Sequence, residues 1–203
     1  MRTFSDMNRR QWICLGLASC LFFTPLRALA DGDILPSDVF LVVMLKALNY
    51  DRKIDRLSQG KIVIGIAYMN GDDQARDFTA KIGSNFHDIR SKSQIKNLPV
   101  EIKVFSFDPS IDKKTMETQL KQEHISALAM TMKDQSINKI ILESTRDLGI
   151  NSVCDSSACA GQGAGLGIVL KDSKPRMLVN LSAVKQEGSD YSAKFLALCD
   201  VVQ

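Results

Sequence analysis

Two cysteines separated by four residues form the most chemically suggestive pair in this sequence. Cys154 and Cys159 flank the segment Asp155-Ser156-Ser157-Ala158. In an exported protein, this arrangement is typical of a disulfide that closes a small loop, which is our leading interpretation. Two free thiols and a redox-active pair are the alternatives. The redox interpretation has little support, because no Lys, Arg or His between Arg146 and Lys171 would lower a thiol pKa.

A run of alternating glycines follows the cysteines, at positions 161, 163, 165 and 167. In a strand these glycines would share one face and would let a helix, another backbone or a ligand approach closely. The nucleotide-binding pattern G-x-G-x-x-G is not completed, because Leu166 and Ile168 occupy the positions where it needs glycine. The run therefore favours close packing, with ligand approach as the alternative.

Patterns for nucleophilic catalysis and metal binding are weak. Ser58–Lys61 and Ser182–Lys185 both match S-x-x-K, but the sequence has neither the S-D-N and K-T-G motifs that accompany such a nucleophile nor a G-x-S-x-G motif. Ser182 is expected to cap a helix instead. The pairs His87-Asp88 and Glu123-His124 are adjacent rather than four residues apart. We predict no catalytic, cofactor or metal site, and hence a protein that is not an enzyme.

A charged segment over residues 51–56 could serve a partner. It reads Asp51-Arg52-Lys53, followed by Asp55-Arg56. We interpret it as a solvated turn crossed by salt bridges, with a partner-binding patch as the alternative.

The first thirty residues are typical of a secretory signal. Arg2, Arg9 and Arg10 precede a short apolar run over residues 12–26, and Ala28-Leu29-Ala30 has the form of a cleavage site. We expect export to the periplasm with cleavage after Ala30, which leaves residues 31–203 as the mature chain. The apolar run is shorter than the roughly 20 residues that span a bilayer. A minor alternative is a lipoprotein, because residues 17–20 resemble a lipobox ending in Cys20.

Removal of this signal changes the charge of the protein. The full chain has 203 residues, 26 basic and 23 acidic, with a formal net charge of +3. Four of the basic and one of the acidic residues lie in residues 1–30, so the mature chain carries 22 of each and no net charge. A neutral chain has no electrostatic reason to bind nucleic acid or anionic lipid. We expect no nucleic-acid partner and no stable membrane insertion of the mature chain.

Apolar strands and amphipathic helices alternate through the first two thirds of the mature chain. Apolar runs at 61–68, 98–107, 125–131 and 150–154 predict strands, several of them buried on both faces. Helices are predicted at 37–50, after Asp72, at 112–123 and from Asp134 to 148. This rhythm predicts a single three-layer α/β domain with a mostly parallel sheet. The first helix is apolar at almost every position, which also favours a homodimer contact.

The last forty residues depart from this rhythm. Strands expected at 163–170 and 176–181 are joined by five residues, too few for a crossover, so they predict an antiparallel hairpin at one edge of the sheet. A terminal helix is expected to follow, with four side chains on its apolar face: Tyr191, Phe195, Leu198 and Val202. Cys199 should lie beside that face as a buried free thiol.

Three segments together resemble the YfiR-like family of exported bacterial proteins. They are residues 35–54, the strand KIVIGIAY, and GLGIVLKDSKPRMLVNLSAVKQEGSDYSAKFLALCDVV over 165–202. The last carries most of the specificity, through Asn180-Leu181, the Gly188–Ser192 break and the Leu-rich end. The resemblance covers most of the mature chain. It implies a compact periplasmic α/β domain that is similar to one lobe of a periplasmic binding protein.

The resemblance also implies a function. The best-known member of the family is a dimeric repressor that binds the sensor domain of an inner-membrane diguanylate cyclase. We therefore expect a non-enzymatic regulator that docks on the periplasmic sensor region of an inner-membrane signalling protein, either a diguanylate cyclase or a sensor kinase. The alternative is a small-solute binding protein with a strand-edge crevice near residues 152–165. An exported enzyme, with redox chemistry as one example, is the third hypothesis.

Overall fold

The computed structural model describes residues 35–131 and 135–202. Several sequence-based predictions lie outside these residues: the signal over residues 1–30, cleavage after Ala30, the acylation alternative at Cys20, and Asp134 as a helix cap.

One mixed sheet organises the described chain, in the order β2-β3-β1-β4-β5-β6-β7-β8. Its strands are β1 (Ile62–Met69), β2 (Gln94–Ile95), β3 (Leu98–Phe107), β4 (Ile125–Met130), β5 (Asn151–Cys154), β6 (Leu166–Lys171), β7 (Lys174–Asn180) and β8 (Asp200–Val202). The five strands from β3 to β6 in this order run parallel. The predicted hairpin is confirmed, because β6 and β7 are antiparallel, and β8 then pairs parallel with β7 at the edge.

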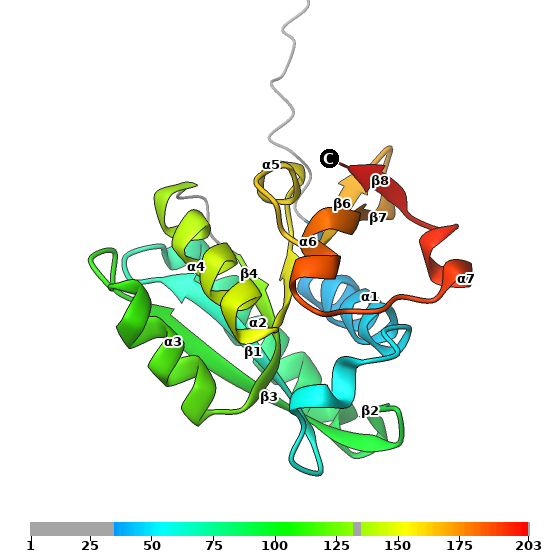
Figure 1. Cartoon of the computed structure of the whole chain (residues 1–203), viewed down its shortest axis with the longest axis horizontal. Helices are drawn as coiled ribbons and strands as arrows, with labels where there is room; N and C mark the ends of the chain where they lie inside the picture. Colours follow the sequence, from blue (N-terminus) through cyan, green and yellow to red (C-terminus); the bar gives the residue numbers. More distant parts are fainter. Residues whose placement is uncertain (1–34, 132–134, 203) are drawn as a thin grey trace, which may run out of the picture. The chain divides into compact units, whose positions relative to one another are not determined.

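Helices cover both faces of the sheet and give the expected three layers (Figure 1). The longer ones are α1 (Ser37–Asn49), α2 (Asp73–Ile89), α3 (Lys113–Gln122) and α4 (Gln135–Leu148). The shorter ones are η1 (Ile54–Leu57), η2 (Arg90–Lys92), α5 (Ser157–Gly161), α6 (Leu181–Gln186) and α7 (Ala193–Leu196). α1 and α2 pack together in one apolar cluster, and α3 and α4 in the other. The predicted α/β fold class is confirmed.

Strand β1 shows how the sequence builds the two cores. Successive side chains of a strand point to opposite faces. Ile62, Ile64 and Ile66 accordingly join the cluster under α1 and α2, whereas Val63 and Ala67 join the cluster under α3 and α4. Both faces are therefore apolar, as a strand between two helical layers requires.

The end of the chain differs from the prediction. In place of one terminal helix, α7 spans only four residues, and the chain then returns to the sheet as β8. Ser192 begins α7 by accepting a hydrogen bond from the Phe195 amide, at 3.3 Å. The β-branched pair Val201-Val202 then satisfies the backbone groups at the edge of β7. Cys199 lies in the turn between them, half-buried, and burial raises its thiol pKa to about 11.

The charged segment after α1 is a solvated turn only in part. Arg52 and Asp55 are exposed and form salt bridges, Arg52 with Asp190 at 2.6 Å and Asp55 with Lys96 at 3.1 Å. Asp51 is fully buried and accepts hydrogen bonds from the Lys53 amide at 2.9 Å, the Asp190 amide at 2.7 Å and the Asn151 side chain at 2.8 Å. Arg56 contacts the same carboxylate at 3.4 Å. Buried charges persist only when they are paired and hydrogen-bonded in this way. Through these hydrogen bonds, Asp51 links η1 and the residues before α7 to the start of β5.

Among the described residues, we find no helix long and apolar enough to cross a membrane.

Candidate functional site

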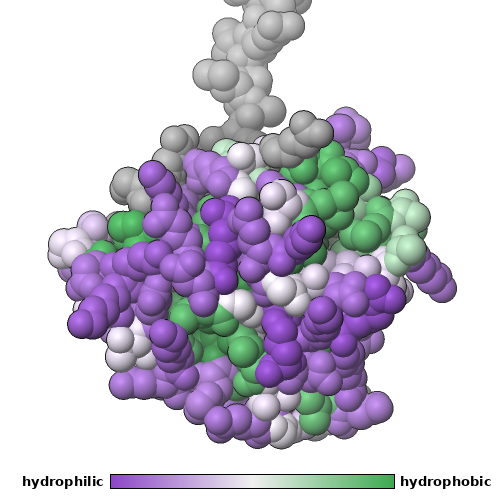
Figure 2. All heavy atoms as spheres, in the orientation of Figure 1, coloured by the Kyte–Doolittle hydropathy of each residue, from purple (hydrophilic) through white to green (hydrophobic). Residues whose placement is uncertain are grey.

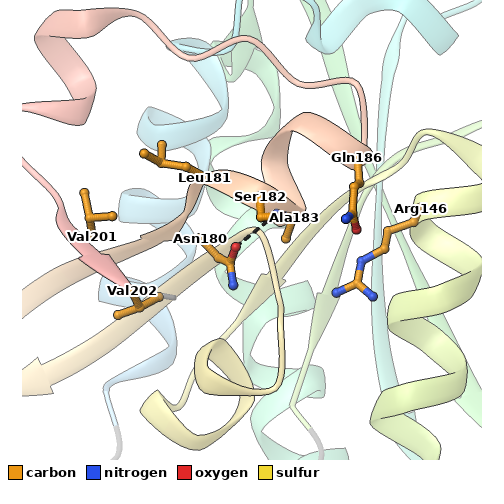
Figure 3. Close-up of a pocket in the computed structure, with 8 residues that line it drawn as sticks. All are labelled: Arg146, Asn180, Leu181, Ser182, Ala183, Gln186, Val201 and Val202. Atoms are coloured by element: carbon orange, nitrogen blue, oxygen red, sulfur yellow. Dashed lines mark hydrogen bonds between the residues drawn. The ribbon is translucent and has the colours of Figure 1, made fainter.

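A pocket of about 470 Å³ lies between the carboxyl-terminal half of α4, helix α6 and the edge strand β8 (Figure 3). Its volume falls in the range of small-molecule sites. Eight residues line it: Arg146, Asn180, Leu181, Ser182, Ala183, Gln186, Val201 and Val202. All of them belong to a single α/β domain, so the pocket needs no second lobe to form its walls.

The junction of β7 and α6 positions one wall of the pocket. Asn180 ends β7, and its Oδ1 accepts a hydrogen bond from the Ala183 amide at 3.0 Å, which caps α6. Asparagine is among the preferred capping residues because its side chain satisfies an amide that the helix leaves unpaired. The amide nitrogen of the same side chain points toward the pocket (Figure 3).

Arg146 supplies the charge of the pocket. It projects from α4, and its Nη2 donates a hydrogen bond to the Gly163 carbonyl at 2.8 Å. A Cβ at position 163 would lie 2.5 Å from Nη2, and the φ of Gly163 is +106°, so both the contact and the backbone require glycine. The buried Nε has no hydrogen-bond partner in the described part of the chain. The guanidinium is thus fixed in place with donor capacity unused.

An apolar wall faces this guanidinium across the pocket, formed by Leu181, Val201 and Val202. Leu181 is 45% exposed and Val201 is 58% exposed, and Leu198 in the preceding turn is 62% exposed. Figure 2 shows apolar side chains gathered over β8 and this turn. One side of the pocket can therefore contact a charged or polar group, and the other an apolar one.

A buried carboxyl lies behind Arg146. Glu187 is 1% exposed, accepts a hydrogen bond from the Ser152 amide at 3.1 Å and contacts the Ser152 hydroxyl. Burial raises the pKa of Glu187 to about 8, although Ser152, Arg146 and Arg56 oppose the shift. At neutral pH this carboxyl is therefore mostly protonated, and it leaves the charge of Arg146 largely uncompensated.

The ligand crevice expected near residues 152–165 is closed at its two ends. Ser152 and Gly165 are buried, the Gly165 amide donates a hydrogen bond to the Ser152 hydroxyl at 2.7 Å, and the Glu187 carboxyl packs against both residues. A Cβ at position 165 would lie 2.5 Å from Glu187 Oε2. The alternating glycines also do not share one strand: Gly161 ends α5 and only Gly167 lies within β6. At positions 163 and 165, the close approach that we expected is made by two side chains of this protein.

Cys154 ends β5, and Cys159 lies in α5. Both are free, buried thiols, and they contact each other. Burial is the main cause of the raised pKa of Cys154, and its hydrogen bond with Cys159 adds to the shift. A raised pKa disfavours thiolate chemistry. The disulfide between them stays a prediction.

We predict that an oxidising compartment links Cys154 to Cys159. A loop this short gives about 2 kcal/mol of stabilisation in the chain-entropy model. The oxidised domain should yield a linked peptide lighter by two hydrogens in mass spectrometry, and lose about that much stability after reduction. Cys199→Ser is the control and should leave both results unchanged. Full alkylation of Cys154 and Cys159 in protein recovered from the periplasm would contradict the prediction.

The other residues that the sequence singled out do not form a site with one another. Ser182 lines the pocket at the start of α6, whereas Ser58 precedes β1 and His87 lies in the last turn of α2. His124, with a positive φ of 51°, occupies the turn before β4. No cluster of three or more His, Cys, Asp or Glu that could hold a metal occurs among the described residues.

The sequence did not indicate Arg146, Gln186 or Glu187 as site residues, because a single polar residue on a helix carries no motif.

Comparison with known proteins finds solved structures with a similar fold, but it does not assign this chain to a family. No family model and no curated protein matches the sequence. A conserved domain protein from Vibrio cholerae has a TM-score of 0.56 at 10% identity, covering 83% of this chain and 60% of that one. A Streptococcus pneumonia protein described as an ABC domain in complex with L-Trp has a TM-score of 0.55 at 12% identity, covering 77% and 60%.

A third solved structure is a ligand-free, open substrate binding protein with adhesive properties from Clostridium difficile. Its TM-score is 0.50 at 11% identity, and the match covers 74% of this chain and 57% of that one. This chain therefore spans about three fifths of the length of each of the three proteins. At such identities the likeness shows a shared α/β fold.

Proposed function

We propose that the mature chain is an exported, periplasmic protein that binds a small solute within a single α/β lobe. The observation that carries this proposal is the pocket between α4, α6 and β8, which has an apolar wall and a charged side in one domain. A two-lobed binding protein closes around its ligand, whereas the described residues of this chain form one lobe. The pocket lies within that lobe, so its walls can enclose a solute by themselves. The fold shared with a protein described as a substrate binding protein supports the proposal.

A thermal-shift screen of the purified chain 31–203 against small neutral, cationic and anionic solutes tests this function. A solute at a hundred times its Kd should stabilise the domain by about 2.7 kcal/mol. Leu181→Asp, in the apolar wall, should abolish the shift. Val104→Asp replaces a similarly exposed apolar residue on β3 and should preserve it. If no solute raises the Tm, the proposal fails.

A second candidate is the regulator implied by the YfiR-like resemblance. The segment that carries this resemblance, residues 165–202, also holds the edge strand β8 and the exposed Leu198 and Val201. An unpaired strand edge with apolar neighbours is a common place for a partner to dock. The partner would be the periplasmic sensor region of an inner-membrane signalling protein, with this chain as a homodimer.

Cross-linking in native cells tests the regulator. A photo-reactive residue at position 198 should capture an inner-membrane signalling protein, and the same probe at Val104 should not. If repeated experiments with the probe at position 198 capture no membrane receptor, the regulator function is contradicted and the solute-binding proposal stands.

A further inference from the structure

The chemical class of the solute follows from the charges around the pocket. Arg146 is the one formally charged side chain among the eight described residues that line it. No acidic side chain of the described chain forms a salt bridge with Arg146. A half-buried guanidinium without a counter-ion is costly, and an anion that enters the pocket recovers that cost.

Polar side chains of the pocket other than Arg146 also favour the binding of an anion. The side-chain nitrogen of Asn180 points toward the pocket, and Gln186 reaches in from the last turn of α6 toward the guanidinium (Figure 3). The hydroxyl of Ser182 lies on the same helix. A planar guanidinium with neighbouring amide donors suits a carboxylate, which accepts two parallel hydrogen bonds. Asn180 pairs with Val202 of β8, so it lies between Arg146 and the apolar wall, and that wall would contact the remainder of such a molecule.

We propose that the pocket binds a small organic carboxylate, with its charged end on Arg146 and its apolar end against the wall formed by Leu181, Val201 and Val202. This inference rests on the proposed solute-binding function and names its substrate class. Inorganic anions lack the apolar end and bind more weakly. Neutral solutes of the same shape lack the partner that Arg146 needs.

The protonation of Glu187 makes this selectivity depend on pH. The groups around its carboxyl are Ser152 from β5, Arg146 from α4 and Arg56 from η1, with Tyr191 and Asp51 farther along the same buried network. Once Glu187 ionises, its carboxylate and the ligand carboxylate compete for Arg146. Affinity for a carboxylate therefore falls as the pH rises above about 8, while Arg146 stays charged.

Isothermal titration of the chain 31–203 with 3-phenylpropanoate, 3-phenylpropanamide and inorganic phosphate tests the inference at pH 6.5. The carboxylate should bind at least tenfold more tightly than the amide and than phosphate. Arg146→Gln should weaken carboxylate binding at least tenfold and leave amide binding unchanged. Arg176→Gln, which removes an exposed arginine of β7, is the matched control and should bind as the parent does.

Two outcomes separate this inference from the function on which it rests. If the amide or a cationic solute binds as tightly as the carboxylate, and Leu181→Asp abolishes that binding, the proposed substrate class is wrong and the proposed function stands. Absence of any solute binding would overturn both. Because Arg146→Gln could unfold the domain, the comparison of the carboxylate with its amide on the unaltered protein decides the substrate class by itself. At pH 9 the affinity should fall severalfold, and Glu187→Gln should abolish that fall.

Discussion

Gly165→Ala should destabilise the domain by about 1–3 kcal/mol, the usual cost of adding a methyl group to a filled interior. The new Cβ would lie 2.5 Å from Glu187 Oε2, 3.3 Å from its Cδ and 3.4 Å from the Ser152 carbonyl oxygen. The carboxyl cannot move freely, because the Ser152 amide and hydroxyl hold it inside the protein. Urea unfolding of the two proteins measures the difference in the free energy of unfolding.

Gly83→Ala is the matched control for this substitution. Gly83 lies inside α2, and a Cβ there would meet nothing within 4 Å. Alanine is favoured over glycine in a helix by roughly 0.5–1 kcal/mol, so this variant should be slightly more stable than the parent. The cost of Gly165→Ala should also shrink when Glu187 is already alanine. Equal stability of the Gly165→Ala variant and the parent would show that the Glu187 carboxyl does not occupy this space.

Glu187→Gln removes a large part of the pH dependence of stability between pH 4.5 and pH 8. Burial raises the pKa of the folded carboxyl from 4.5 to about 8. Between these two values the folded state keeps a proton that the unfolded state has released, so stability falls as the pH rises. The contribution is fully present below pH 4.5, and it is lost progressively up to about pH 8. Its slope is at most about 1.4 kcal/mol per pH unit.

Glutamine can replace the neutral acid without losing its contacts. Its amide oxygen can accept from the Ser152 amide, and its nitrogen can donate to the Ser152 hydroxyl oxygen. The variant should therefore match the parent near pH 5 and exceed it in stability at pH 8, by denaturant unfolding at each pH. The carboxyls of Asp55, Glu101 and Asp190 have lowered pKa values, so the stability that they contribute is lost at lower pH, as the pH falls. Their effects cancel in the difference between variant and parent. Parallel pH profiles of the two proteins would contradict the burial of a neutral Glu187.

Much of the sheet could be predicted from the sequence, because its central strands are buried on both sides. Apolar runs such as residues 125–131 leave no other element with the right length and composition, and β4 spans Ile125–Met130 with every residue buried. The helix cap predicted at Asp72 is also confirmed, because its side chain accepts a hydrogen bond from the Ala75 amide at 2.9 Å. The last forty residues were harder. Tyr191, Phe195 and Leu198 have helical spacing, but pairing with the free edge of β7 stabilises residues 200–202 as a strand.

The candidate site could not be predicted, since its chemistry depends on contacts across the chain. Asp51 looked like part of a surface turn, and its burial follows from pairing with Asn151, one hundred positions later. Arg146 and Glu187 each stand alone in the sequence, and only the fold brings them to adjacent glycines at 163 and 165. A bare glycine run does signal close approach. It does not say that the approaching groups are a guanidinium and a carboxyl.

An NMR titration of isotope-labelled chain 31–203 with 3-phenylpropanoate tests the central claim, that the pocket between α4, α6 and β8 binds a small solute. We predict saturable amide shift changes concentrated in residues 181–186 and 200–202 and at Arg146, with 3-phenylpropanamide producing the same pattern only at much higher concentration. Shift changes that cluster at the carboxyl ends of β1 and β3, or a spectrum unchanged at millimolar ligand, would contradict it.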